Sequence, residues 1–314
     1  MDKPGLLVVG ELPEWDFSEL SQRFTLHHYW RAADKAAMLA EHAGSIVAIS
    51  TKGEIGADAA LMDALPLTKI IACYGVGVDA IDLEAARARG IRVTNTPDVL
   101  TEEVADMAML LLLAAARQVK LGDAWVRDGS WVAKGPMPLT TRVWGKRIGI
   151  VGMGRIGRAI ARRAAAFGMP VSYSGRAPQP ALPYTHYPTP AALAPHVDIL
   201  CVSAAGGAAT RGLVDRAAIE ALNPGVIFVN VSRGTVVDEA ALLEALRSGR
   251  IAAAGLDVFL NEPEIDPEFL RLPNLVLQPH AASGTVETRR DMGRLMRENL
   301  EAQIDGRPLL TPIV

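Results

Sequence analysis

Residues 147–161 read RIGIVGMGRIGRAIA, and this stretch decides the fold. A short apolar run enters a G-x-G-x-x-G turn, and an alanine-rich segment of helical character follows at once. In such a unit Gly152 makes the tight turn, Gly154 lets the backbone approach a pyrophosphate, and Gly157 allows close packing of helix on strand. The unpaired N–H groups at the start of the helix attract phosphate. The stretch therefore predicts a dinucleotide site, with a purely structural glycine turn as the alternative; its cofactor-binding residues would be Gly152, Met153, Gly154, Arg155, Ile156 and Gly157.

The end of the next apolar run indicates which dinucleotide binds. In NAD-binding folds an acidic residue about 20 positions after the turn holds the ribose 2′-hydroxyl. Residues 171–178 read VSYSGRAP and contain no acid. Ser174 can instead hydrogen-bond a 2′-phosphate, and Arg176 can pair with it. We therefore predict that Ser174, Gly175 and Arg176 bind NADP(H) in preference to NAD(H), unless Arg176 is simply a solvated loop residue.

Short apolar runs alternate with helix-like segments along both halves of the chain. Continuous apolar runs are typical of parallel strands covered on both faces, and their alternation with helices predicts doubly wound sheets. A longer helical pattern, expected over residues 101–127, separates the halves and is expected to bridge them. The fold class predicted is thus α/β, with two doubly wound parallel-sheet domains. The predicted strands are 6–9, 46–49, 70–73, 91–94, 147–151, 171–174, 199–202, 226–230, 254–257 and 275–277.

Composition excludes several classes of function. The 314 residues are 50% hydrophobic and 21% charged, an ordinary balance for two folded domains. Lys and Arg number 32 against 35 Asp and Glu, so the net charge of −3 gives no case for a nucleic-acid or anionic-membrane partner. We expect a cytoplasmic protein with a small-molecule partner, since neither a membrane span nor a secretory leader is evident. Cys73 and Cys201 lie in apolar runs and are expected to be buried thiols, and no metal site is predicted.

Three further motifs each follow a predicted strand, which is where open α/β sheets bind their ligands. They are NVSRG at 230–234, GLDVFLNEP at 255–263 and LQPHAAS at 277–283, and YGVGVD occurs at 74–79 in the first half. Together with the glycine turn, and in this order, they resemble the D-isomer-specific 2-hydroxyacid dehydrogenases over nearly the whole chain. Within that family, the second strand without an acid is most similar to the NADPH-dependent glyoxylate and hydroxypyruvate reductases.

The resemblance implies a catalytic set of Arg233, Glu262 and His280. Reduction of a 2-keto acid needs a cation for the carboxylate and carbonyl, a role that the planar guanidinium of Arg233 suits, although a structural ion pair is the alternative. His280 would donate the proton, and Glu262 would keep the imidazole protonated. Five other histidines lack an adjacent motif and are expected in peripheral helices or loops: His27, His28, His42, His186 and His196.

The resemblance also implies a division of the chain. A flavodoxin-like, discontinuous substrate (lid) domain would comprise residues 1–98 and 285–314, and a Rossmann dinucleotide-binding domain would comprise residues 99–284. Val76 and Gly77 would bind substrate together with Arg233 and His280. Asp257 is expected on the cofactor side, with a purely structural role as the alternative. Further cofactor contacts are expected at Val202, Ser203, Val231, Ser232, Arg233, His280 and Ser283.

Residues 129–145 form an aromatic connector too long for a simple loop. We expect an arm that embraces a second subunit and hence a homodimer, although a packed surface loop is the alternative. Trp131 or Trp144 would reach the partner's site. The substrate expected is glyoxylate or hydroxypyruvate; a bulkier keto acid of the phenylpyruvate or 2-ketogluconate type, and a nucleotide-sensing corepressor-like protein, are the alternatives.

Overall fold

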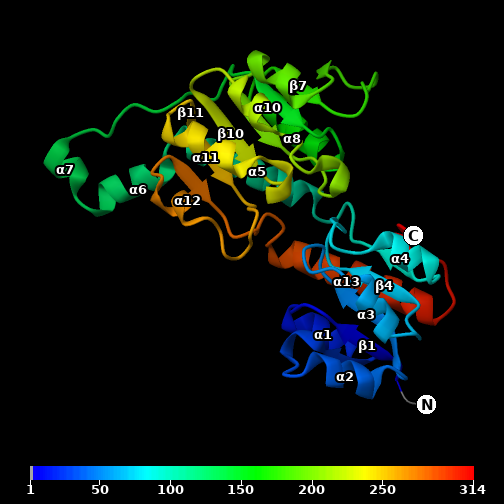
Figure 1. The fold of residues 1–314 in the computed structure, drawn as a ribbon. Coiled ribbons are helices and arrows are strands. Elements are labelled where there is room, and N and C mark those ends of the chain that lie inside the picture. The colour runs from blue at the N-terminus through cyan, green and yellow to red at the C-terminus, as the bar shows by residue number, and fades with distance from the viewer. Residues whose placement is uncertain (1–2) are drawn as a thin grey trace. The chain divides into compact units, whose positions relative to one another are not determined.

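The computed structural model describes residues 3–314, which divide into two compact units (Figure 1). The first unit contains the chain up to Leu100 together with Ser283–Val314, and the second unit is Thr101–Ala282. These limits differ from the predicted ones, 1–98 with 285–314 and 99–284, by two residues at each crossing. Each unit is built on its own parallel sheet, so the predicted class of two doubly wound α/β domains is confirmed.

The first unit has a five-stranded sheet in the order β2-β1-β3-β4-β5, which is the flavodoxin-like order. Helices α3 and α4 pack together, and so do α1 and α13. The strands are β1 Gly5–Val8, β2 Thr25–His28, β3 Ile46–Thr51, β4 Ile70–Cys73 and β5 Arg92–Thr94. The helices are α1 Glu14–Leu20, the 3-10 turn η1 Tyr29–Arg31, α2 Lys35–His42, α3 Ala59–Ala64, α4 Leu83–Ala88 and α13 Val286–Ile304.

The second unit has a seven-stranded parallel sheet in the order β12-β11-β10-β9-β6-β7-β8. Helix α5 packs on α8 and on the central strands, so closely that a Cβ on Gly255 would lie 2.6 Å from Leu111 Cβ. The strands are β6 Ile148–Val151, β7 Val171–Ser174, β8 Thr185–Tyr187, β9 Ile199–Val202, β10 Val226–Asn230, β11 Ile251–Leu256 and β12 Leu275–Leu277. The helices are α5 Thr101–Ala116, α6 Val119–Arg127, α7 Ser130–Lys134, α8 Arg155–Ala166, α9 Pro190–Leu193, α10 Arg216–Glu220, α11 Glu239–Arg247 and α12 Pro267–Arg271, with 3-10 turns η2 Ala194–His196, η3 Ala208–Thr210 and η4 Gly234–Val236.

Two strands escape prediction, and both lie at the edge of a sheet. Strands β2 and β8 pair with one neighbour each and carry polar side chains, so they lack the apolar run by which the central strands are identified. The expectation that all five further histidines lie in helices or loops is therefore wrong. His27 and His28 are in β2, and His186 is in β8.

The predicted helix over 101–127 is also wrong in one respect, because it is broken. Helix α5 ends at Ala116, Gln118 has a left-handed backbone with φ of 48°, and α6 begins at Val119. A non-glycine residue in this conformation is uncommon and leaves no mark in the sequence pattern. All of α5 and α6 belong to the second unit, and Figure 1 shows α6 and α7 extending away from its sheet.

Cys73 and Cys201 are buried thiols, as expected from their apolar runs. Burial raises the pKa of the Cys201 thiol to about 12, which keeps it in the unreactive neutral form. Across residues 3–314, no helix combines the length and the apolar character that crossing a membrane requires.

Candidate active site

The turn after β6 can be built only with glycine at two positions. Gly152 has φ of +97°, and a Cβ there would lie 2.6 Å from the backbone N of Ala204. A Cβ on Gly157 would lie 2.1 Å from the carbonyl oxygen of Gly152, so helix α8 could not approach the turn. The backbone of the turn is held on both sides, since Gly152 donates to the Ser174 carbonyl at 2.9 Å and accepts from Ser203 Oγ at 2.9 Å.

Gly154, the middle glycine of the turn, differs from the other two. Gly154 precedes the first residue of α8, and a Cβ there would meet no heavy atom within 4 Å. Gly154, the N-cap residue, makes no side-chain hydrogen bond to the start of α8, where the backbone N–H groups and the positive dipole end favour an anion. Open space in front of these N–H groups suits a pyrophosphate, and the turn fits a dinucleotide.

The end of β7 lies next to this turn. Ser174 is buried at the end of the strand, and Arg176 is exposed two residues later. Gln179 joins their loop to the glycine turn, because its Nε2 donates to the Met153 carbonyl at 3.0 Å and its Oε1 accepts from Arg158 Nη2 at 2.6 Å. Sequence reasoning missed Gln179 and Arg158, whose long-range contacts have no local signal.

His280 lies on a strained turn after β12. Its φ is +50°, a conformation that costs free energy in a non-glycine residue and is common at functional sites. The buried Asp257 fastens this turn, because its carboxylate accepts from the backbone N–H groups of Ala281 at 2.7 Å and Ala282 at 3.1 Å. The backbone N–H of His280 donates to the Asp257 carbonyl at 2.8 Å. The structural alternative for Asp257 thus has direct support, and its cofactor contact stays a prediction.

Glu262 reaches His280 from the loop after β11. Glu262 Oε2 lies 2.6 Å from His280 Nδ1, and Oε1 accepts from the Phe259 backbone N–H at 2.7 Å. Burial lowers the pKa of His280, but the hydrogen bond and charge of Glu262 outweigh it, and the pKa lies above its usual value. Burial raises the pKa of Glu262, but the same bond, the Phe259 N–H and the Arg233 charge bring it below its usual value. Both shifts favour an imidazolium beside a carboxylate.

Arg233 follows β10 and lies near this pair. Its charge lowers the pKa of both Glu262 and His280, and its Nη1 donates to the Ser232 carbonyl at 2.8 Å. Asn230 shapes the turn, because its Oδ1 accepts from Ser232 N and Oγ while its Nδ2 donates to the Arg233 carbonyl. The structure thus brings the three predicted catalytic residues together from three strand ends.

The remaining predicted site residues lie in both units. Val202 ends β9, Ser203 follows it, and Val231 and Ser232 follow β10, all at the carboxyl edge of the second unit's sheet. Val76, Gly77 and Ser283 belong to the first unit.

The loop that holds Val76 and Gly77 is closely packed within the first unit. Asn95 Nδ2 donates to the Val76 carbonyl at 2.8 Å, and a Cβ on Gly53 would lie 2.2 Å from the Gly77 carbonyl oxygen. A loop fixed in this way presents its backbone N–H groups in a set geometry, which is what anion binding by a backbone nest requires.

Known proteins are similar to this chain in sequence and in fold. Residues 109–282 match the family described as "D-isomer specific 2-hydroxyacid dehydrogenase, NAD binding domain". The chain is 45% identical to the glyoxylate/hydroxypyruvate reductase A HPR2 of Arabidopsis thaliana, covering 100% of both chains. It is 44% identical to the 2-ketogluconate reductase of Gluconobacter oxydans, covering 99% of both.

A solved structure extends the similarity to the fold. It is an NADPH-dependent glyoxylate/hydroxypyruvate reductase from Sinorhizobium meliloti in complex with NADP and malonate, which is 41% identical, with a TM-score of 0.92 over 100% of this chain and 97% of that chain. The motifs, the two parallel sheets and these similarities agree, and the chain belongs to the D-isomer specific 2-hydroxyacid dehydrogenase family.

Proposed function

We propose that the protein uses NADPH to reduce small 2-keto acids, converting glyoxylate to its achiral 2-hydroxy acid and hydroxypyruvate to a D-2-hydroxy acid. The observation that carries the proposal is the 2.6 Å contact between His280 and Glu262 within the electrostatic reach of Arg233. A 2-keto acid brings a carboxylate and a carbonyl, and its reduction creates an alkoxide that needs a proton. In this cluster Arg233 is a cation for the carboxylate and the carbonyl, and His280 is an acid for the alkoxide.

Each residue has a separate role in the proposal. When bound, NADPH supplies the hydride. The Arg233 guanidinium binds the substrate carboxylate and polarises the carbonyl through its planar fork. His280 carries the proton at Nε2, because Nδ1 faces Glu262, and delivers it to the carbonyl oxygen. In the first unit, Val76 and Gly77 offer backbone N–H groups of the kind that binds a carboxylate.

The preference for NADPH rests on the end of β7. Ser174 and Arg176 offer a hydroxyl and a cation, and no carboxylate lies in residues 171–178 to repel a 2′-phosphate. The Sinorhizobium meliloti enzyme, which is described as NADPH-dependent, shares the fold at 41% identity.

The direct test follows NADPH oxidation with glyoxylate, hydroxypyruvate, pyruvate, phenylpyruvate and 2-ketogluconate, and determines the chirality of the alcohol formed. We expect the highest kcat/KM with glyoxylate or hydroxypyruvate and a D-configured product from hydroxypyruvate. An L-configured product, or no oxidation with any of the five, would contradict the proposal.

A bulkier substrate is the second candidate, and one similarity favours it. The Gluconobacter oxydans relative, named a 2-ketogluconate reductase, is 44% identical over almost the whole chain. Because pocket size discriminates by only about 1 to 3 kcal/mol for each methylene, the same assay separates the two candidates by the ratio of kcat/KM values.

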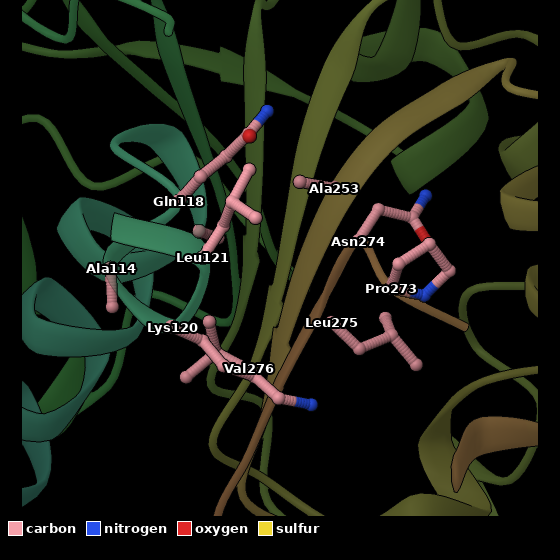
Figure 2. Close-up of a pocket in the computed structure, with 10 residues that line it drawn as sticks. Ala114, Gln118, Lys120, Leu121, Ala253, Pro273, Asn274, Leu275 and Val276 are labelled. Carbon is pink, nitrogen blue, oxygen red and sulfur yellow. The ribbon is translucent and has the colours of Figure 1, made fainter. Parts of the chain in front are cut away.

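We further propose that the protein is a homodimer held by an arm that comprises helix α6 and the connector predicted for this role, residues 129–145. None of the residues of α6 is buried, and on the arm Val126 is 59%, Val132 95% and Leu139 99% exposed. A pocket of about 180 Å³ lies beside the base of the arm, between the α5–α6 junction and strands β11 and β12, with Leu121, Leu275 and Val276 in its wall (Figure 2). Exposed apolar side chains that gather on one segment favour an interaction surface.

The two tryptophans of the connector differ in their surroundings. Both tryptophans are exposed, Trp131 to 61% on α7 and Trp144 to 65%, but the Trp144 indole also packs against Gly168 of its own unit, where a Cβ would lie 2.8 Å from Nε1. Trp131 is therefore the better candidate to reach a partner's site. Light scattering after size exclusion should give a dimer for the wild type and for the control Leu270→Asp, and a monomer for Val132→Asp with Leu139→Asp. A dimeric double variant would contradict the role of the arm.

We also propose a cytoplasmic location, supported by the two buried cysteines in the thiol form, which is usual in reducing compartments. Fractionation of cells that express the tagged protein tests this, and recovery outside the cytosolic fraction would contradict it.

A further inference from the structure

Glu239 is a buried carboxyl that the proposed chemistry does not use. It is the first residue of α11, where an acid is usually solvated and interacts with the helix dipole. Here it is only 9% exposed, and the neighbouring Asp238 already caps the helix by accepting from the Ala241 N–H. A buried carboxyl costs free energy unless it is hydrogen-bonded, so its partner matters.

The partner of Glu239 lies on the loop that carries Glu262. Glu239 Oε1 accepts from the Leu260 backbone N–H at 2.7 Å, and Glu262 Oε1 accepts from the Phe259 N–H at 2.7 Å. Two consecutive N–H groups of the loop are therefore bound by two carboxylates. One of these carboxylates belongs to the catalytic candidate and the other to a helix outside the loop.

The turn that carries Arg233 packs against the same part of the loop. A Cβ on Gly234 would lie 2.0 Å from the carbonyl carbon of Phe259 and 2.4 Å from the N of Leu260. Only glycine allows this approach, because the contact is with backbone that cannot swing aside. The Phe259–Leu260 peptide thus lies between the Arg233 turn, to which it is packed, and Glu239, to which it is hydrogen-bonded.

We propose that Glu239 is a positioning residue for the catalytic pair: it fastens the Phe259–Leu260 peptide so that Glu262 presents Oε2 to His280. The proposal rests on the proposed role of His280 and Glu262. Without the Leu260 bond, the loop loses this hydrogen bond to α11, and the 2.6 Å contact between Glu262 and His280 becomes less populated.

The charge of Glu239 is consistent with this position. Burial raises the pKa of Glu239 to about 7, the Leu260 N–H opposes the shift, and the charges of Asp266 and Glu262 add to it. Both the neutral and the ionised carboxyl can accept the Leu260 bond, and so can an amide oxygen. Glutamine at this position should therefore preserve the clamp, whereas a side chain without an acceptor should remove it.

The test measures the pKa of the His280 imidazole by NMR titration of the protein without cofactor, so that it does not depend on turnover. Glu262→Gln sets the scale, because it removes the carboxylate that raises this pKa. Glu239→Leu has a similar volume but no acceptor, and Glu239→Gln keeps one. The matched control is Glu244→Gln on the same helix, whose exposed carboxylate pairs with Arg216.

We expect Glu262→Gln to lower the His280 pKa by about one unit or more, Glu239→Leu to lower it by about half of that shift, and the other two variants to leave it within about 0.2 units. If Glu239→Leu does not fold, Glu239→Asp replaces it, since the shorter side chain withdraws the acceptor from Leu260. A wild-type pKa in a folded Leu or Asp variant would overturn the proposal. So would a Glu239→Gln shift equal to that of the Leu variant.

The scale variant separates this proposal from the proposed function. If Glu262→Gln lowers the His280 pKa and Glu239→Leu does not, only the role of Glu239 fails. If Glu262→Gln itself leaves the pKa unchanged, the His280–Glu262 pair has no catalytic tuning role and both proposals fail.

Discussion

The glycine turn and the catalytic cluster are built in opposite ways. Between Gly152 and Gly157, the site is backbone, and what matters is the absence of side chains at two contacts and an open approach at a third. In the cluster, Arg233, Glu262 and His280 come from three strand ends and depend on further residues that hold their loops. A site made of backbone is encoded locally, whereas a site made of side chains is encoded across the sheet.

The largest effect is expected in the cluster. Replacing His280 by Asn removes the proton donor while leaving a side chain of similar size, and kcat for glyoxylate reduction should fall about 10²- to 10⁴-fold. The Tm should stay close to that of the wild type, because asparagine tolerates the φ of +50° at this position. A loss smaller than about tenfold in kcat would mean that another group donates the proton.

The two kinds of glycine in the turn should separate stability from binding. Gly157→Ala places a Cβ against a carbonyl oxygen, so it should lower both the Tm and the affinity for NADPH. Gly154→Ala meets only open space at φ of −80°, so its Tm should equal or exceed that of the wild type, while affinity falls about tenfold or more. Equal losses of Tm in the two variants would remove the distinction.

A smaller effect is expected at the edge of the nucleotide site. Arg176→Ser removes the cation proposed to pair with the 2′-phosphate, and the ratio of kcat/KM for NADPH over NADH should drop by about 10- to 100-fold. Lys134→Ser, which removes a cation on α7, serves as the control and should leave the ratio unchanged. An unchanged ratio for the Arg176 variant would assign that residue to the solvated surface.

The smallest effect concerns stability. The folded-state pKa of Glu239, about 7, lies above its unfolded value, so its contribution to stability is present at low pH and is lost as the pH rises through 7. The glutamine of Glu239→Gln cannot ionise, so its contribution to the free energy of unfolding does not fall as the pH rises. Relative to the wild type, its free energy of unfolding should therefore rise by on the order of 1 kcal/mol between pH 5 and pH 8.5. Stability is measured by urea unfolding. If the difference in urea midpoint between Glu239→Gln and the wild type is the same at both pH values, Glu239 does not titrate in this range.

Structural features that depend on a local motif or on a periodic pattern can be predicted from the sequence, and features without such a signal are missed. The central strands appear as apolar runs, and the glycine turn is recognisable from spacing alone. The edge strand β2 is short and polar. The helix breaks at Gln118, which adopts a left-handed backbone conformation, and the sequence has no glycine at that position to indicate it.

Within the candidate site, the catalytic residues are identified by resemblance to a family, whereas their supports are not. Glu239 looks like an ordinary acid at the start of a helix, and only folding shows that its carboxyl is buried against Leu260. Asp257 is visible in a motif, yet its two bonds to the turn that carries His280 join positions 24 and 25 residues apart.

The central claim is that the imidazole of His280 is kept protonated by Glu262 for the reduction of a keto acid. It is tested most directly by the pH dependence of kcat/KM for glyoxylate reduction with saturating NADPH, in the wild type and in Glu262→Gln. Because the pair raises the pKa of His280, the wild-type rate should hold to a pH above the usual histidine value and then fall. In the variant the fall should begin about one pH unit lower. Superposable profiles for the two proteins would contradict the account.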